Sequence, residues 1–247
     1  MSGHSKWASI KHKKAITDSK KGKTFTKIVK EISIAARMGG GDVSGNPRLR
    51  KAIEDGKAAN MPIENIKRAV MKGTGQLPGI IYEEITYEGY GPGGVAVLVE
   101  CLTDNRNRTI ANVRHAFGKA GGNVGTEGCV AWMFDQKGLI SVNKTDATED
   151  QLMDIALEAG AEDIRDEGDT FDIISEPADF DTVKNAIDEA GIKYIEADIT
   201  MLPQTLSPVQ GAEAEQMIKF MDALDDLEDV QKFYTNADIP DEVFEAI

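Results

Sequence analysis

The side chains with the clearest chemistry in this 247-residue sequence are the lysines crowded at its start. Residues 1–30 contain nine lysines and one acidic residue, with aromatic side chains between them. Ammonium groups neutralise phosphates and release counterions, which gives tight but salt-sensitive binding to a polyanion. We therefore predict that this segment binds nucleic acid. The lysines expected to contact it are Lys6, Lys11, Lys13, Lys14, Lys20, Lys21, Lys23 and Lys27.

Trp7 and His12 lie among these lysines, and Trp7 offers a stacking surface for an unpaired base. The alternative is that Trp7 packs into the core of a bundle beneath a solvated lysine face. Lysine does not distinguish one base from another, because its contacts are with phosphates. The composition therefore favours contact with the nucleic-acid backbone over readout of a base sequence.

A second group of cations, Arg48 and Arg50, follows Pro47 in the first turn of a predicted helix. Cations at this end oppose the helix dipole, and a phosphate bound at the same end would offset that cost. The alternative is an ion pair with Glu54 or Asp55, which is equally compatible with the spacing.

A third group, Arg106, Asn107 and Arg108, lies in a polar loop between a predicted strand and a predicted helix. Arginine is suited to bidentate contacts with phosphates and base edges, so we predict a second nucleic-acid contact here. The alternative is a structural turn that Asn and Asp side chains stabilise.

Signals for catalysis are weak. The three histidines form no HExxH motif or ligand cluster, and neither a GxSxG nor a GxxxxGK[ST] motif occurs. The acidic residues after 141 lack the spacing of a calcium-binding loop, so a solvated face is expected. We predict no catalytic residue, no metal, no cofactor and no small-molecule substrate.

The charge is strongly segregated along the chain. Residues 1–72 carry a net charge of +11, residues 73–140 carry −2, and residues 141–247 carry −23. A basic end of this kind indicates a polyanionic partner. The acidic end would be repelled by that partner and would face outward or meet a different one.

The elements that must position these groups follow from periodicity. Apolar residues at helical spacing predict an N-terminal bundle with helices at 22–38, from 46 and from 62 to 73, followed by a linker at 73–79. Strands are predicted at 83–91, 95–103 and 130–134, with a helix at 109–119. From 137 the order is βαββαβ, typical of a ferredoxin-like unit, and a helix at 213–226 and a strand at 230–237 follow it.

The predicted fold class is therefore α+β and multidomain: a helical bundle, then two α/β domains, of which the ferredoxin-like one is inserted into the other. The predicted limits are 1–75 for the bundle, 76–136 with 204–247 for the middle domain, and 137–203 for the inserted domain. No run approaches the roughly 20 apolar residues that span a bilayer. The lysine-rich start has no apolar leader, and the two cysteines form no CxxC motif, so we predict a cytoplasmic protein without membrane contact.

Four long segments resemble the YebC/PmpR family in the same order along the chain. They are GHSKWASIKHKKAITDSKKGKTFTKIVKEISIAAR, NPRLRKAIEDGKAANMPIENIKRAVMKGTG, YEGYGPGGVAVLVECLTDNRNRT and FGKAGGNVGTEGCVAWMF. The resemblance implies the same three-domain fold. It places Lys6, Trp7, Lys11, His12, Lys13 and Lys14 in the family's opening basic motif. It also places Arg106, Asn107 and Arg108 in the family's TDNxNRT motif.

The resemblance leaves two functions open. Bacterial members are described as probable transcriptional regulators that bind DNA. Mitochondrial relatives act as translational activators, and some bacterial members are linked to ribosomes stalled on proline-rich sequences. Our first expectation is a DNA-binding transcriptional regulator, and the alternative is a ribosome-associated translation factor that binds ribosomal or transfer RNA. A third class is an adaptor whose acidic domain docks basic proteins.

Overall fold

The computed structural model describes residues 18–245, and the side chains of 22–240 and 242–244. Three helices form the first unit: α2 (Asp18–Gly39), α3 (Pro47–Ala58) and α4 (Ile63–Gly73). They pack around a core that includes Ile32, Leu49 and Ile66. Asn46 begins α3 as predicted, because its side-chain oxygen accepts the N–H of Leu49 at 3.0 Å and its amide donates to the carbonyl of Ala35 at 2.8 Å.

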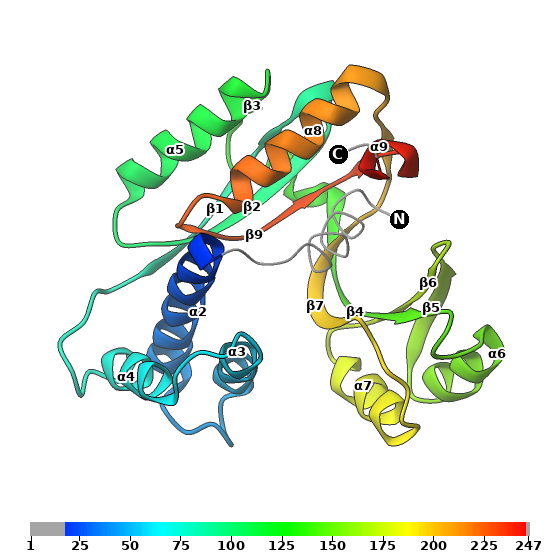
Figure 1. Ribbon diagram of the computed structural model, residues 1–247, viewed down its shortest axis with the longest axis horizontal. Helices are drawn as coiled ribbons and strands as arrows, with labels where there is room; N and C mark the ends of the chain where they lie inside the picture. Colours follow the sequence, from blue (N-terminus) through cyan, green and yellow to red (C-terminus); the bar gives the residue numbers. More distant parts are fainter. Residues whose placement is uncertain (1–17, 246–247) are drawn as a thin grey trace.

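The second unit is built on a four-stranded sheet with the order β3-β1-β2-β9. Its strands are β3 (Asn123–Val124), β1 (Glu83–Tyr90), β2 (Ala96–Thr103) and β9 (Val230–Thr235). Helices α5 (Arg106–Lys119) and α8 (Gly211–Asp225) lie against the sheet in Figure 1. Phe117 of α5 and Phe220 of α8 meet edge to face with ring centroids 4.8 Å apart, in a core that also contains Val97 and Val99.

The third unit has a second four-stranded sheet, with the order β5-β6-β4-β7 and antiparallel neighbours throughout. Its elements are β4 (Phe134–Asn143), α6 (Glu149–Leu152) continued by the π-helix η3 (Met153–Leu157), β5 (Ala161–Asp166), β6 (Thr170–Ser175), α7 (Phe180–Glu189) and β7 (Glu196–Pro203). The βαββαβ order with the first strand beside the third and fourth is the ferredoxin-like arrangement.

After β7 the chain returns to the middle unit. The pair β8 (Ser207–Pro208) and β10 (Ala237–Asp238), α8, β9 and α9 (Asp241–Glu245) complete it. The ferredoxin-like unit is therefore inserted between β2 and β9, which are neighbours in one sheet. The predicted fold class is confirmed, and the exact domain limits stay a prediction. No helix within residues 18–245 is long and apolar enough to span a membrane.

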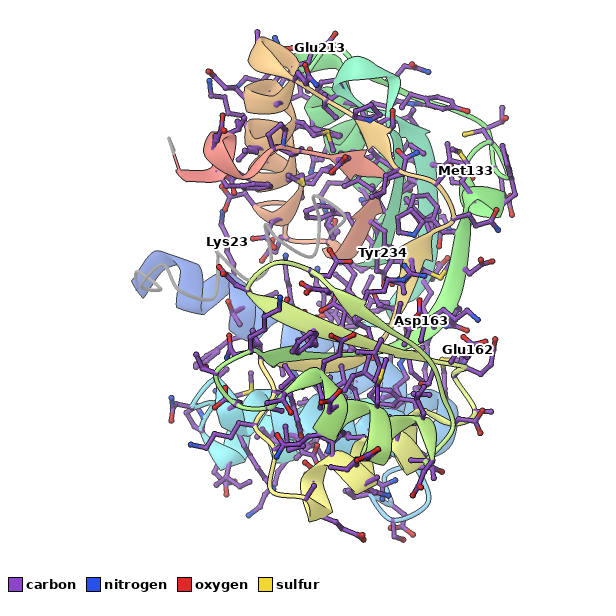
Figure 2. All side chains as sticks on the ribbon, turned by 90° about the vertical axis from the view of Figure 1, so that its right-hand side faces the viewer. Lys23, Met133, Glu162, Asp163, Glu213 and Tyr234 are labelled. Carbon is purple, nitrogen blue, oxygen red and sulfur yellow. The ribbon has the colours of Figure 1, made fainter. Side chains whose placement is uncertain are left out.

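The middle unit joins both others (Figure 1). Helix α2 extends from it into the bundle on one side, and β4 and β7 lead into the ferredoxin-like unit on the other. Figure 2 shows Tyr234 of β9 where the middle sheet approaches the inserted unit. Its neighbour Lys232 forms an ion pair there with Asp198 of β7. This ion pair links the middle sheet to the inserted unit, and Met201 of β7 packs against the apolar cluster around Tyr234.

The prediction of a strand at 130–134 is wrong. Residues Ala131–Met133 form a short 3-10 helix (η2), and β4 begins only at Phe134. The cause is the buried carboxylate of Glu88, which accepts the backbone N–H groups of Gly128 at 2.6 Å, Val130 at 2.8 Å and Ala131 at 2.7 Å. Because these donors are taken by a side chain, the segment turns instead of joining a strand ladder.

Candidate nucleic-acid interface

About half of the predicted contact set lies where the structure gives no side-chain position. Lys6, Trp7, Lys11, His12, Lys13 and Lys14 fall outside the described residues. Lys20 and Lys21 belong to the first turn of α2, and their side chains are likewise outside the described set. Their roles stay predictions.

The next two predicted lysines lie on the side of α2 that meets the middle unit (Figure 2, where Lys23 is labelled). The ammonium of Lys23 lies 3.0 Å from Asp226 Oδ1. Lys27 donates to the backbone carbonyl of Asp225 at 2.8 Å and lies 3.3 Å from its carboxylate. Both lysines are therefore held by acidic residues at the end of α8.

One turn further along α2, Lys30 enters a buried polar cluster that the sequence analysis did not identify. Its ammonium lies 2.6 Å from Asp229 Oδ1, and both side chains are 6% exposed. Asp229 also accepts hydrogen bonds from Thr109 Oγ1 at 2.8 Å and from Arg108 Nη2 at 3.0 Å. Burial raises the pKa of Asp229, but these hydrogen bonds outweigh it and hold the pKa below its ordinary value.

The predicted TDNxNRT cluster forms the start of α5, three residues earlier than expected. Asn105 caps the helix by accepting the N–H of Arg108 at 3.0 Å, and Arg108 also contacts Asp104 at 2.6 Å. Arg106 pairs with Glu83 at 2.7 Å, while the Asn107 side chain is exposed. Both arginines of the motif thus have carboxylate partners, and their role in nucleic-acid contact stays a prediction.

Arg48 is also anchored. It contacts Glu31 of α2 at 2.6 Å and Glu84 of β1 at 2.6 Å, instead of the acidic residues of its own helix. Hydrogen bonding to Glu31 outweighs partial burial and raises the pKa of the Arg48 guanidinium, so the group is a permanent cation. Arg48 therefore braces the bundle against the middle sheet.

Four exposed cations of the bundle behave differently. Among the described side chains of residues 22–75, Arg50, Lys57, Arg68 and Lys72 have neither an acidic partner within 4 Å nor a side-chain hydrogen bond. The first two lie two turns apart on α3, and the last two lie one turn apart on α4, so each pair shares a helix face. We call these four residues the unpaired cations.

Of these four residues, only Arg50 was predicted from the sequence to contact nucleic acid. The sequence did contain a signal for the other three, because they lie off the apolar stripe of their helices. Their i,i+7 and i,i+4 spacing also places the two members of each pair on one helix face. What the sequence did not show is which cations the fold neutralises. Lys51 and Lys67, on the same helices, are paired with Asp55 and Glu64.

Other chemistry is sparse in the described part of the chain. Residues 18–245 contain no cluster of three or more potential metal ligands. A cavity of about 80 Å³ lies beside Arg108, Asn112 and Leu227, well below the roughly 300 Å³ of typical small-molecule sites. Burial raises the pKa of Cys101 to about 12, which keeps this thiol protonated and unreactive.

Comparison with known proteins places the whole chain in one group. A family model described as the TACO1/YebC protein N-terminal domain matches residues 5–76, and one described as the TACO1/YebC second and third domain matches residues 82–237. A probable transcriptional regulatory protein of Desulforapulum autotrophicum is 66% identical over 247 residues, covering 100% of both chains. One of Geobacter sulfurreducens is 55% identical over the same coverage.

A solved structure is also similar. The crystal structure of a conserved hypothetical protein from Aquifex aeolicus aligns with a TM-score of 0.81 and 45% identity. The alignment covers 91% of this chain and 93% of the Aquifex chain.

Proposed function

The chain belongs to the TACO1/YebC family, and from this premise we propose that it is a non-enzymatic, cytoplasmic regulator of transcription that binds duplex DNA through its N-terminal bundle. Its relatives are named probable transcriptional regulatory proteins. The observation that carries the proposal is the unpaired cations, four exposed charges without partners among the described side chains of the bundle. Free cations on helix faces are the groups that neutralise phosphates.

The unpaired cations favour recognition of the backbone. Arg106 and Arg108, the predicted candidates for base-edge contacts, are occupied by Glu83 and by Asp104 and Asp229. Contacts with phosphates position a protein on a duplex and carry no sequence information directly. Ribosomal RNA presents the same phosphates as duplex DNA, so it is the second candidate partner.

The test compares two sets of substitutions in the same bundle. Changing Arg50, Lys57, Arg68 and Lys72 together to glutamine should weaken binding to a 20-base-pair duplex at least about 10-fold. It should also reduce the slope of log Kd against log salt by about one for each phosphate that is no longer neutralised. The matched control changes Lys51 and Lys67 to glutamine, because their charges are already paired.

Fluorescence anisotropy measures both properties. The control should lose less affinity than the quadruple variant, because each of its lysines has to leave a carboxylate before it can neutralise a phosphate. A quadruple variant that is folded by circular dichroism and binds like the control would refute the assignment of these cations. The same titration with a ribosomal RNA hairpin separates the two candidate partners.

A further inference from the structure

Three successive lysines of α2 meet three aspartates of the middle unit. We call this set the lysine–aspartate joint. Its pairs are Lys23 with Asp226 at 3.0 Å, Lys27 with Asp225 at 3.3 Å, and Lys30 with Asp229 at 2.6 Å. The lysines follow one another at intervals of four and three residues, so they share one face of the helix. The aspartates come from the end of α8 and the turn that leads to β9.

Exposure falls steadily along the joint. Lys23 and Asp226 are 46% and 56% exposed, and Lys27 and Asp225 are 15% and 32% exposed. Lys30 and its partner are sealed at 6% each. The outer end of the joint is therefore open to competing ions, whereas the inner end is closed to them.

The open end lies next to the part of the chain with the highest density of lysine. Lys23 follows Lys20 and Lys21 in α2, and the lysines of the opening segment precede them along the chain. A polyanion that engages this segment would bring further phosphates to Lys23 first and to Lys27 next. Both lysines belong to the predicted contact set, yet aspartates hold them here.

Carboxylate and phosphate oxygens accept the same charge-assisted hydrogen bonds from an ammonium group. We propose that Asp225 and Asp226 are an internal competitor for nucleic-acid phosphates, which occupy Lys23 and Lys27 only after displacing these carboxylates. The inference rests on the proposed function, since it needs a nucleic-acid partner. Lys30 and Asp229 stay paired during the exchange and act as the pivot that keeps α2 attached to the middle unit.

The exchange has a consequence for shape. Helix α2 also supplies Ile32 and Ala36 to the core of the bundle, so the bundle moves with the helix. Releasing the outer two pairs while the pivot stays closed loosens the seam between α2 and the α8–β9 turn. Because Arg48 also holds the bundle to Glu84 of β1, a change in the orientation of the bundle requires that this contact shifts as well.

The test removes the competitor without touching the lysines. Asp225→Asn with Asp226→Asn should bind a 20-base-pair duplex about 3- to 10-fold more tightly at 0.15 M salt, because two partly exposed pairs no longer compete. The matched control is Asp150→Asn with Asp154→Asn, which changes net charge equally on exposed residues of the inserted unit. Screening at this salt has a length of about 8 Å, so the control should stay within about twofold of wild type.

The reverse variant keeps the test informative. Lys23→Gln with Lys27→Gln should lose affinity by about 3-fold or more if these lysines take up phosphates, and should lose none if they serve only the joint. The inference would be overturned if the Asp225/Asp226 variant and the Asp150/Asp154 control bound with equal affinity, or if the lysine variant bound like the wild type. In either case, binding of the wild type to nucleic acid would leave the proposed function standing. Wild-type protein that binds neither duplex DNA nor RNA would remove both.

Discussion

Replacing Asp229 by asparagine is the sharpest test of how the bundle is attached. The substitution keeps the shape of the side chain and an acceptor for Thr109 Oγ1, but it removes the charge that faces Lys30. Lys30 is 5% exposed and would retain the carbonyls of Leu102 and Glu228, at 3.4 Å and 3.0 Å, and the ring of Tyr82, whose centroid lies 5.7 Å from its ammonium. Its ammonium would thus be left buried without a counter-charge.

The expected cost follows from that burial. Removing one partner of a buried ion pair costs about 3–5 kcal/mol, because the other charge remains desolvated. Arg108 moderates the loss, since its side chain is 46% exposed and keeps Asp104. We therefore expect a loss of about 3–4 kcal/mol in the free energy of unfolding. For a chain of this length that corresponds to a fall in Tm of about 6–16 °C.

A thermodynamic cycle identifies the pair as the cause. Lys30→Met removes the orphaned charge, so the double variant should be less destabilised than the sum of the two single variants, by about 2 kcal/mol. The assay is thermal unfolding followed by circular dichroism at pH 7. A loss below about 1 kcal/mol in Asp229→Asn, or strict additivity in the cycle, would refute the argument that this buried pair holds α2 in place.

The contribution of Asp229 to the free energy of unfolding should depend on pH in a defined direction. The folded pKa of Asp229 lies below its ordinary value of 3.8, so its contribution is present above that value. The contribution is lost as the pH falls through the folded pKa. The wild type should therefore lose more stability on acidification than Asp229→Asn does.

Three further predictions concern other parts of the fold. Burial raises the pKa of Asp172 to about 6, so its contribution to the free energy of unfolding should fall as the pH rises from about 4 to 6. Asp172→Asn should remove that fall and raise the free energy of unfolding at pH 7 by about 1–2 kcal/mol. Denaturant titrations over a series of pH values measure both effects. Glu88→Gln should cost about 2–3 kcal/mol by the same assay, because an amide cannot accept all three backbone N–H groups; a change below 0.5 kcal/mol, on the order of a neutral surface substitution, would contradict this. Gly73→Ala would place Cβ 2.3 Å from the carbonyl oxygen of Ser33 and should destabilise the bundle by about 1–3 kcal/mol, whereas Gly118→Ala, which meets open space in helix α5, should be neutral or stabilising in a melting experiment.

Local patterns predicted the elements of the fold well. The strand predicted at 95–103 matches β2 to within one residue, and Asn46 begins α3 as expected, because both signals depend on neighbouring residues. The strand predicted at 130–134 failed for the opposite reason. Its apolar residues resemble a strand, but its backbone donors are captured by Glu88, about 40 positions earlier in the chain.

The candidate site shows the same division. Residue type and spacing identified lysines and arginines that are able to bind phosphates, but they did not reveal which of them the fold already neutralises. Arg108 and Asp229 are 121 positions apart, and Lys30 and Asp229 are 199 positions apart. Partners at such separations become visible only when the sheet and helices are assembled. The unpaired cations on α3 and α4 are those that remain without an acidic partner among the described side chains of the bundle once the fold is assembled.

The proposed function depends on electrostatic binding of this chain to the backbone of nucleic acid. The most direct measurement is the affinity of the full chain for two duplexes of unrelated sequence between 0.05 M and 0.3 M salt. We expect equal affinities for the two duplexes and a fall in log K with log salt of slope about −4 or steeper, since at least four phosphates would be neutralised. An affinity that depends on sequence but not on salt, or no measurable binding at the lowest salt, would contradict it.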